Sequence, residues 1–282
     1  MSTPAIRTQD LTFAYAAGRA PALLGLNLTV QRGEFLGIIG ENGAGKTTLL
    51  KNLVGLLRPT AGKVWIEGQD AGRLAVSELA TRIGFVLQNP DQQLFAQTVE
   101  EEIAFGPRNL GLDRDVIRAR TDRAIAATGL DAVRDEFPPA LPKGERAKVV
   151  IASVLAMQPR ILILDEPTTG QDYKGCHQIM GIARQLHGEG HTVLVVTHDM
   201  SLIAEYTART LVLHGGRVLL DGPTAEVLAQ PEILGRTHVL PPQITQLSQA
   251  LPPRLGLPPT ALTVQELGQH ILEKRKREGE ER

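Results

Sequence analysis

The sequence predicts an α/β fold whose core is a parallel sheet, and two observations support it. Continuous apolar runs occur at residues 35–39 and 161–164, with a third strand expected at 192–196; such runs are typical of central strands covered on both faces. From residue 161 to residue 220, strand-like and helix-like segments alternate, which implies a parallel sheet. The 282 residues are enough for one large α/β domain with an appendage.

The N-terminal segment has a different pattern. Residues 5–70 carry short strand-like segments at 5–12, 26–30 and 63–67, separated by turn-like sequences. This pattern predicts an N-terminal antiparallel β subdomain in front of the parallel core.

A helix-rich insertion is expected next. Residues from about 90 to 152 are charged and helical in pattern, and the clearest amphipathic run is 113–128. We expect this segment to form a helical subdomain inserted into the core. With it, the first domain spans residues 1–232.

After residue 231 the alternation stops. Three Pro-Pro pairs, at 241–242, 252–253 and 258–259, separate short helical pieces. The sequence from Thr263 to Glu266 is typical of a capping box and predicts a last helix through about residue 277. We therefore expect residues 233–282 to form a small C-terminal helical extension.

Composition excludes some functions. The net charge is −1 and aromatic residues make up 4% of the chain, so neither a basic surface nor base-stacking platforms indicate a nucleic-acid partner. The single cysteine, Cys176, fits a reducing compartment. The sequence starts without the apolar stretch of a signal peptide and has no apolar segment of membrane-spanning length. We expect a cytosolic chain that can take part in transport only together with a membrane partner.

A glycine-rich loop follows the first buried run. Its sequence G-E-N-G-A-G-K-T-T connects a strand to a helix that begins at Lys46. The glycines allow backbone N–H groups to converge on phosphate oxygens, aided by the positive end of the helix. Lys46 can reach the outer phosphates and the Thr47 hydroxyl can ligate Mg²⁺. The predicted nucleotide-binding residues are Gly40, Glu41, Asn42, Gly43, Ala44, Gly45, Lys46, Thr47 and Thr48.

Further polar residues follow other strands of the predicted sheet. Asp165 ends the run at 161–164 and can hold Mg²⁺, while Glu166 can orient and polarise the attacking water. His198 follows the strand at 192–196 and can contact the γ-phosphate. Gln88 follows a strand at 83–87, where its amide can touch both Mg²⁺ and water. Glu166, His198 and Gln88 are the predicted catalytic residues.

This ordered set of motifs resembles the ATP-binding cassette (ABC) family over about residues 5–230. The phosphate loop matches Walker A, residues 161–166 Walker B, Gln88 the Q-loop and His198 the switch histidine, while residues 170–172 match the D-loop with its Asp172. The resemblance implies a RecA-like P-loop NTPase core, ATP and Mg²⁺ as ligands, and ATP hydrolysis coupled to transport. It also implies that Tyr15 stacks on adenine, and that Mg²⁺ is held by Thr47, Gln88 and Asp165.

A finer resemblance is to the ATPase subunits of energy-coupling factor (ECF) transporters. It is carried by Q-N-P-D-Q-Q-L-F at 88–95, T-V-E-E-E-I-A-F-G-P at 98–107 and T-T-G-Q-D-Y at 168–173. It implies an importer of a vitamin or a transition-metal ion, with a second ATPase subunit, an integral membrane coupling subunit and a separate substrate-binding membrane subunit. The chain would then lie peripherally on the cytoplasmic face of the membrane, and its C-terminal extension would contact its counterpart in the partner ATPase.

The signature motif departs from the family pattern Leu-Ser-Gly-Gly-Gln. In the family this segment reaches the γ-phosphate held by the other subunit of a dimer. Pro142 removes a hydroxyl and a backbone donor, and Lys143 adds bulk, although its charge could substitute as a phosphate contact. We therefore expect a heterodimer, while a homodimer stays possible through Lys143. The degenerate signature consists of Leu141, Pro142, Lys143, Gly144 and Glu145.

Two alternatives to the ECF function remain open, and the sequence argues against a third. The first is the ATPase of another class of ABC importer. The second is a regulatory nucleotide-binding module with little turnover; Glu166 argues against it and the weak signature leaves it open. The third is a DNA-repair or chromosome-organising ATPase, but about 60 inserted residues leave no room for long heptad repeats.

Overall fold

The core of the protein is a six-stranded sheet of order β10-β9-β3-β8-β7-β6. The computed structural model describes residues 3–16 and 18–280, so residues 1, 2, 17, 281 and 282 of the expected domains lie outside the described residues. Five strands run parallel and β10 pairs antiparallel to β9, which confirms the predicted parallel core. The strands are β3 (Phe35–Ile39), β6 (Ile83–Val86), β7 (Ile161–Asp165), β8 (Thr192–Val196), β9 (Arg209–His214) and β10 (Arg217–Pro223).

A second, antiparallel sheet has the order β2-β1-β4-β5. Its strands are β1 (Ile6–Phe13), β2 (Leu23–Val30), β4 (Ala61–Ile66) and β5 (Gln69–Asp70). Along β2, buried and exposed residues largely alternate, as expected for a strand with one face on a core. The buried side chains of β1 and β2 share one hydrophobic core with helix α1 (Lys46–Leu53), so this sheet covers one face of the parallel sheet.

The other face of the parallel sheet is covered by helices α5 (Lys143–Ala156), α6 (Tyr173–Gly188) and α7 (Met200–Tyr206). Because β3, β7 and β8 are buried on both faces, they read as apolar runs in the sequence. Helix α1 is shorter than its apolar pattern suggests: Gly55 turns the chain at φ 76°, and Leu56 is 54% exposed. The short helix α2 (Val76–Ala80) precedes β6.

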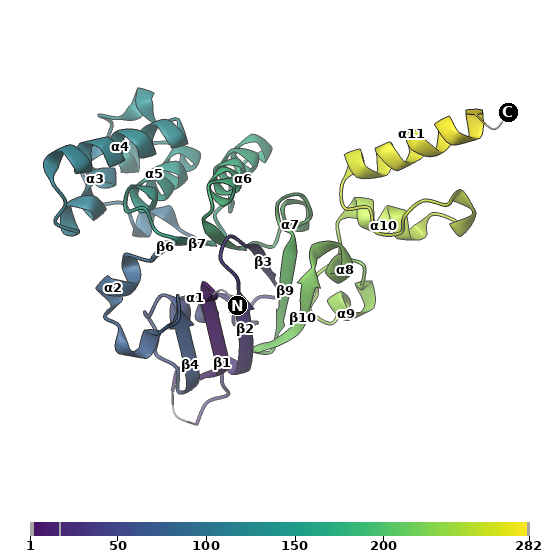
Figure 1. Cartoon of the computed structure of the whole chain (residues 1–282), viewed down its shortest axis with the longest axis horizontal. Coiled ribbons are helices and arrows are strands. Elements are labelled where there is room, and N and C mark those ends of the chain that lie inside the picture. Colours follow the sequence, from purple (N-terminus) through teal and green to yellow (C-terminus); the bar gives the residue numbers. More distant parts are fainter. Residues whose placement is uncertain (1–2, 17, 281–282) are drawn as a thin grey trace.

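Helices α3 (Val99–Asn109) and α4 (Arg114–Thr128) pack around α5 at one end of the molecule (Figure 1). They bury a core of their own, which includes Val99, Ile103, Ile125, Leu130, Val149 and Ala152. The amphipathic run predicted at 113–128 forms α4 and is confirmed. Helix α5 also packs on the parallel sheet through Val150, Ile151 and Val154, so it continues past residue 152 and belongs to both cores.

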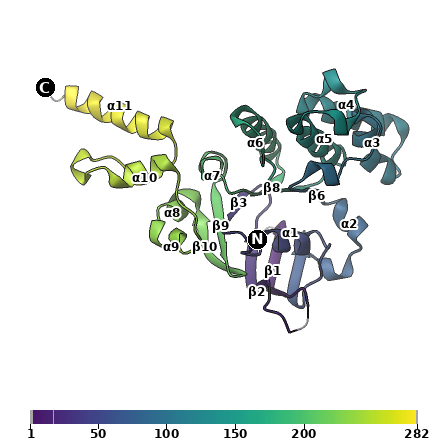
Figure 2. The same cartoon turned by 180° about the vertical axis from the view of Figure 1, so that it is seen from behind.

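The C-terminal segment lies at the opposite end from α3 and α4, as Figures 1 and 2 show. It contains α8 (Thr224–Leu228), α9 (Pro231–Gly235), α10 (Gln243–Ala250) and α11 (Val264–Glu280). The Thr263 hydroxyl accepts a hydrogen bond from the N–H of Glu266, but the Glu266 carboxylate accepts from the N–H of Leu262 instead of returning to Thr263. Val239 and Leu262 pack against the core of the parallel sheet. Short 3-10 turns lie at Ala71–Arg73, Pro90–Gln92, Asp131–Val133, Pro138–Ala140 and Pro253–Leu255.

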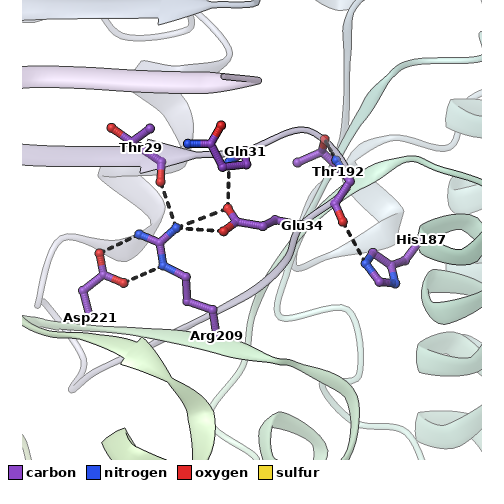
Figure 3. A network of polar contacts seen from close by, with 8 residues as sticks. Thr29, Gln31, Glu34, His187, Thr192, Arg209 and Asp221 are labelled. Atoms are coloured by element: carbon purple, nitrogen blue, oxygen red, sulfur yellow. Dashed lines mark hydrogen bonds and ion pairs between the residues drawn. The ribbon is translucent and has the colours of Figure 1, made fainter. Parts of the chain in front are cut away.

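One polar network joins the two sheets at the edge away from the glycine-rich loop (Figure 3). The Arg209 guanidinium makes two 2.7 Å hydrogen bonds to Asp221, contacts Glu34, and donates to the carbonyl of Thr29 in β2. These hydrogen bonds, those to Asp221 first, raise the pKa of Arg209. Among the described helices, none is long and apolar enough to cross a bilayer.

Candidate nucleotide-binding site

The glycine-rich loop connects β3 to α1 at the carboxyl edge of the parallel sheet. Gly40, Gly43 and Gly45 have φ of 146°, 82° and 101°, which L side chains rarely adopt. A Cβ on Gly40 would lie 2.2 Å from the carbonyl oxygen of Leu213, and one on Gly45 would lie 2.6 Å from that of Ala22. Both glycines are therefore required by the packing of the loop as well as by its backbone angles.

Lys46 folds back over the loop. Its ammonium donates to the carbonyls of Gly40 at 2.7 Å and Glu41 at 2.9 Å. Burial lowers the pKa of Lys46, and the negative charges of Glu166, Asp165 and Glu41 oppose this shift. Phosphate oxygens in the loop would offer this cation full negative charge in place of carbonyl dipoles, so an anionic ligand can take over these contacts.

Asp165 ends β7 with a buried carboxylate that is 2% exposed. Burial raises the pKa of Asp165, and a hydrogen bond from Thr47 opposes the shift. Its Oδ1 atom has no hydrogen-bond partner among the residues that the structure describes. A buried carboxylate oxygen beside a hydroxyl is a donor set that suits Mg²⁺, so Thr47 and Asp165 fit this ion.

Glu166 follows β7 with a φ of 49°, an uncommon angle for a residue with a side chain. Its N–H donates to the carbonyl of Val196, which fixes it beside the end of β8. The Glu166 carboxylate lies 2.7 Å from Nδ1 of His198. The two predicted catalytic residues are thus in contact, with the Glu166 side chain 12% exposed and that of His198 75% exposed.

Tyr15 and Gln88 complete the set of predicted site residues. The Tyr15 hydroxyl is 3.0 Å from the Thr48 hydroxyl in the glycine-rich loop, and its ring is 62% exposed. The ring is therefore next to the loop with a face available for stacking. Gln88 is exposed just after β6, two strands away from β8 in the sheet.

The segment that resembles the signature motif packs against residues 170–172 of the same chain. Pro142 is the N-cap of α5 and Lys143 is its first residue. The stem and ammonium of Lys143 lie over Gly170, where an added Cβ would be 2.4 Å from Nζ. Glu145 pairs with Lys148 at 2.9 Å, which neutralises the charge that it brings to this region. Asp172 caps α6 by accepting from the N–H of Gly175.

An apolar groove of about 430 Å³ runs beside residues 92–95. Phe95 and Phe105 stack edge to face with ring centroids 4.6 Å apart, and both are exposed, at 57% and 44%. Leu94, which looks equally exposed in the sequence, packs instead between two cores. The groove is lined by Leu56, Val76, Phe85, Leu87, Gln93, Phe95, Phe105 and Met157, among others.

Some contacts in this region have no signal in the sequence. His214, at the end of β9, lies 2.8 Å from the carboxylate of Glu41 in the glycine-rich loop. Neither this pair nor the contact between Lys143 and Gly170 follows a motif or a spacing, because each joins residues far apart in the chain. Only the folded structure places them together.

Comparison with known proteins agrees with this geometry. The family model described as ABC transporter matches residues 23–169. A putative ABC transporter ATP-binding protein of Methanosarcina acetivorans is 42% identical over 94% of this chain, and the match covers 43% of that protein. The chain spans less than half the length of three such curated relatives. The energy-coupling factor transporter ATP-binding protein EcfA of Methanocaldococcus jannaschii is 37% identical over 90% of this chain and 91% of its own length.

Solved structures show the same fold. CbiO1 from Clostridium perfringens, described as part of the ABC transporter complex cbiONQ, is 35% identical with a TM-score of 0.76, covering 87% of this chain and 99% of that one. The dimeric cassette MJ0796 bound to ADP and Pi is 29% identical with a TM-score of 0.71, covering 78% and 98%. The chain therefore belongs to the ABC ATPase family and is a relative of the energy-coupling factor transporter ATP-binding proteins.

Proposed function

We propose that this chain binds and hydrolyses ATP with Mg²⁺ and drives a membrane importer of the ECF type. The observation that carries the proposal is the convergence of Lys46, Asp165, Glu166 and His198 at one edge of the parallel sheet. These groups supply what phosphoryl transfer needs, which is positioning and charge neutralisation.

Each residue has a distinct task in this proposal. The N–H groups of the glycine-rich loop and Lys46 bind the phosphates. Thr47 and Asp165 would hold Mg²⁺, and this ion would supply charge neutralisation for the transferred phosphoryl group. The Glu166 carboxylate orients the attacking water and accepts its proton, and His198, 2.7 Å away, keeps this carboxylate in place. Tyr15 would support the adenine ring by stacking. Gln88 would contact Mg²⁺ with its amide, and its neighbour Leu87 lines the apolar groove.

The test of the chemistry is Glu166→Gln. The amide keeps the shape of the side chain but cannot accept the proton, so hydrolysis at this site should fall by about 10²-fold or more while nucleotide binding survives. Steady-state turnover and nucleotide titration, measured in the complex with its partners, check both parts. Glu189→Gln is the matched control, because Glu189 lies after α6 and its carboxylate accepts a hydrogen bond from Gln185. Parental turnover in Glu166→Gln would exclude this role for Glu166.

Transport is proposed from the relatives and from the groove. EcfA proteins are named as energy-coupling factor transporter subunits, and CbiO1 is described as part of the cbiONQ complex. The groove beside Gln88 exposes apolar rings, which a cytoplasmic helix of an integral membrane subunit could cover. In this arrangement the chain is peripheral at the cytoplasmic face. A separate membrane subunit would bind the solute, a vitamin or a transition-metal ion.

The active form is proposed to be a heterodimer with a second ABC ATPase. Pro142 leaves the start of α5 without a hydroxyl and without one backbone donor, and the Lys143 side chain lies over Gly170. A partner with a regular signature would complete this chain's own ATP site, while this chain would offer its partner a poorer one. If turnover remained negligible in the complete complex, the low-turnover regulatory module would be the better description.

A further inference from the structure

Two histidines face the Glu41 carboxylate, which the proposed chemistry leaves without a task. Nδ1 of His214 lies 2.8 Å from one carboxylate oxygen, and Nε2 of His238 lies 4.0 Å from the other. His214 is the last residue of β9. His238 lies in the turn after α9, where the C-terminal extension begins. Glu41 is therefore the point where the phosphate loop, the sheet and the extension meet.

The turn between β9 and β10 supports the phosphate loop directly. The N–H of Gly216 donates to the carbonyl of Ala44 at 3.1 Å. The Leu213 carbonyl lies so close to Gly40 that a Cβ there would be 2.2 Å away. His214, between these two contacts, is thus held against the loop. Its buried Nδ1 makes no aligned hydrogen bond with any described residue, so a small rotation of Glu41 can complete or lose one.

His238 is held in place by its neighbours in the chain. Its φ of 54° is unusual for a residue with a side chain. On one side, Thr237 is fully buried and donates to the carbonyl of Leu234. On the other side, Val239 packs against the core of the parallel sheet. The backbone therefore fixes where the imidazole starts, although the ring itself is 84% exposed.

Glu41 is also linked to the phosphate loop's cation. Its carbonyl is one of the two oxygens that accept hydrogen bonds from the Lys46 ammonium. Phosphate oxygens compete for this ammonium. If Lys46 moves to them, the Glu41 backbone loses a hydrogen bond, and its carboxylate can then shift between the two imidazoles.

We propose that Glu41 couples the nucleotide site to the C-terminal extension, with His214 as a positioning residue and His238 as the contact from the extension. This rests on the proposed binding of ATP. It deepens that proposal by assigning a route through which the occupied site changes the segment that begins at residue 236. The route uses one carboxylate and two imidazoles and needs no movement of the sheet.

The test compares hydrogen exchange in the full chain with and without Mg²⁺ and a non-hydrolysable ATP analogue. In the parent, the analogue should change exchange in residues 236–250. His238→Ala should abolish this change while affinity stays within about fivefold, because an exposed pair contributes about 1 kcal/mol at most. His270→Ala is the matched control, since His270 bonds the Glu266 carbonyl within α11 and should leave the change intact.

His214→Ala tests the positioning role. It should weaken analogue binding by about three- to tenfold, as expected for loss of a half-buried polar contact. His214→Gln keeps a side-chain N–H donor and should recover most of the affinity, which a merely structural role would not predict. A nucleotide-dependent change that persists in His238→Ala, or its absence in a parent that binds the analogue, would overturn the coupling. A parent that binds no analogue would instead overturn the proposed function, and the coupling with it.

Discussion

At the scale of single residues, burial of the Asp165 carboxylate affects the stability of the protein. Its carboxylate is 2% exposed, and burial raises its pKa. A group with a raised pKa contributes stability that is fully present below its ordinary pKa and lost as pH rises through the folded-state value. At a pH above the raised pKa the ionised side chain therefore destabilises the nucleotide-free protein, and Mg²⁺ would relieve this.

The matching prediction concerns Asp165→Asn. At about pH 7 the nucleotide-free variant should unfold at a higher temperature than the parent. The shift should be about 2–4 °C for each kcal/mol gained in unfolding free energy. The difference should vanish at acidic pH, where the parent carboxyl is also neutral. Adding Mg²⁺ with ATP should stabilise the parent more than the variant. Thermal unfolding across pH measures all three effects, with the exposed Asp113→Asn as control. A lower midpoint for Asp165→Asn at neutral pH would contradict the assignment.

The site residues differ in how far they can be predicted. Lys46, Asp165 and His198 follow strands of one parallel sheet, whose carboxyl ends share an edge, so their proximity can be expected from the sequence. The pairing of Glu41 with His214 and that of Lys143 with Gly170 depend on how loops pack. No periodicity or spacing encodes such contacts, and they could not have been predicted.

At the scale of elements, buried strands were easier to predict than the ends of helices. β3 and β8 match their expected ranges because both faces are covered and the apolar runs are unbroken. α1 ends before its apolar pattern does, since Gly55 turns the chain. The subdomain boundary expected near residue 152 falls inside α5 (Lys143–Ala156), because the residues of this helix serve two cores. Tertiary packing, which a local pattern does not contain, decides where α1 ends and where the helical subdomain stops.

The groove gives a prediction at this scale. Phe95→Asp places a charge on an exposed ring position, so it should release the membrane subunit while stability and nucleotide binding stay close to those of the parent. Leu94→Asp places the same charge among buried apolar side chains and should lower the unfolding free energy by about 2 kcal/mol or more. Co-purification with the membrane subunit and thermal unfolding separate the two variants. Undiminished co-purification of Phe95→Asp would argue against this groove as the docking site.

At the scale of the whole molecule, the proposed heterodimer would place the degenerate signature and the catalytic groups in different ATP sites. Lys46, Asp165, Glu166 and His198 would serve the nucleotide that this chain binds. Its signature segment would serve the nucleotide of the partner. In the proposed heterodimer, one site joins this chain's catalytic groups to a regular signature, and the other depends on Pro142 and Lys143.

The last prediction follows from this asymmetry. Each charge-assisted hydrogen bond to a phosphate contributes about 1.5–3 kcal/mol, so losing several of them makes the partner's site the slower one. Glu166→Gln in this chain should then silence the heterodimer, whereas the equivalent change in the partner should leave much of the turnover. Replacing Pro142 by Ser and Lys143 by Gly should speed the slow site. Steady-state ATP turnover of purified heterodimers with one altered subunit at a time measures these effects. A homodimer of this chain with brisk turnover would contradict the asymmetry and show that Lys143 replaces the missing donors. The Lys143 charge would be available for a phosphate, because Glu145 is already paired with Lys148.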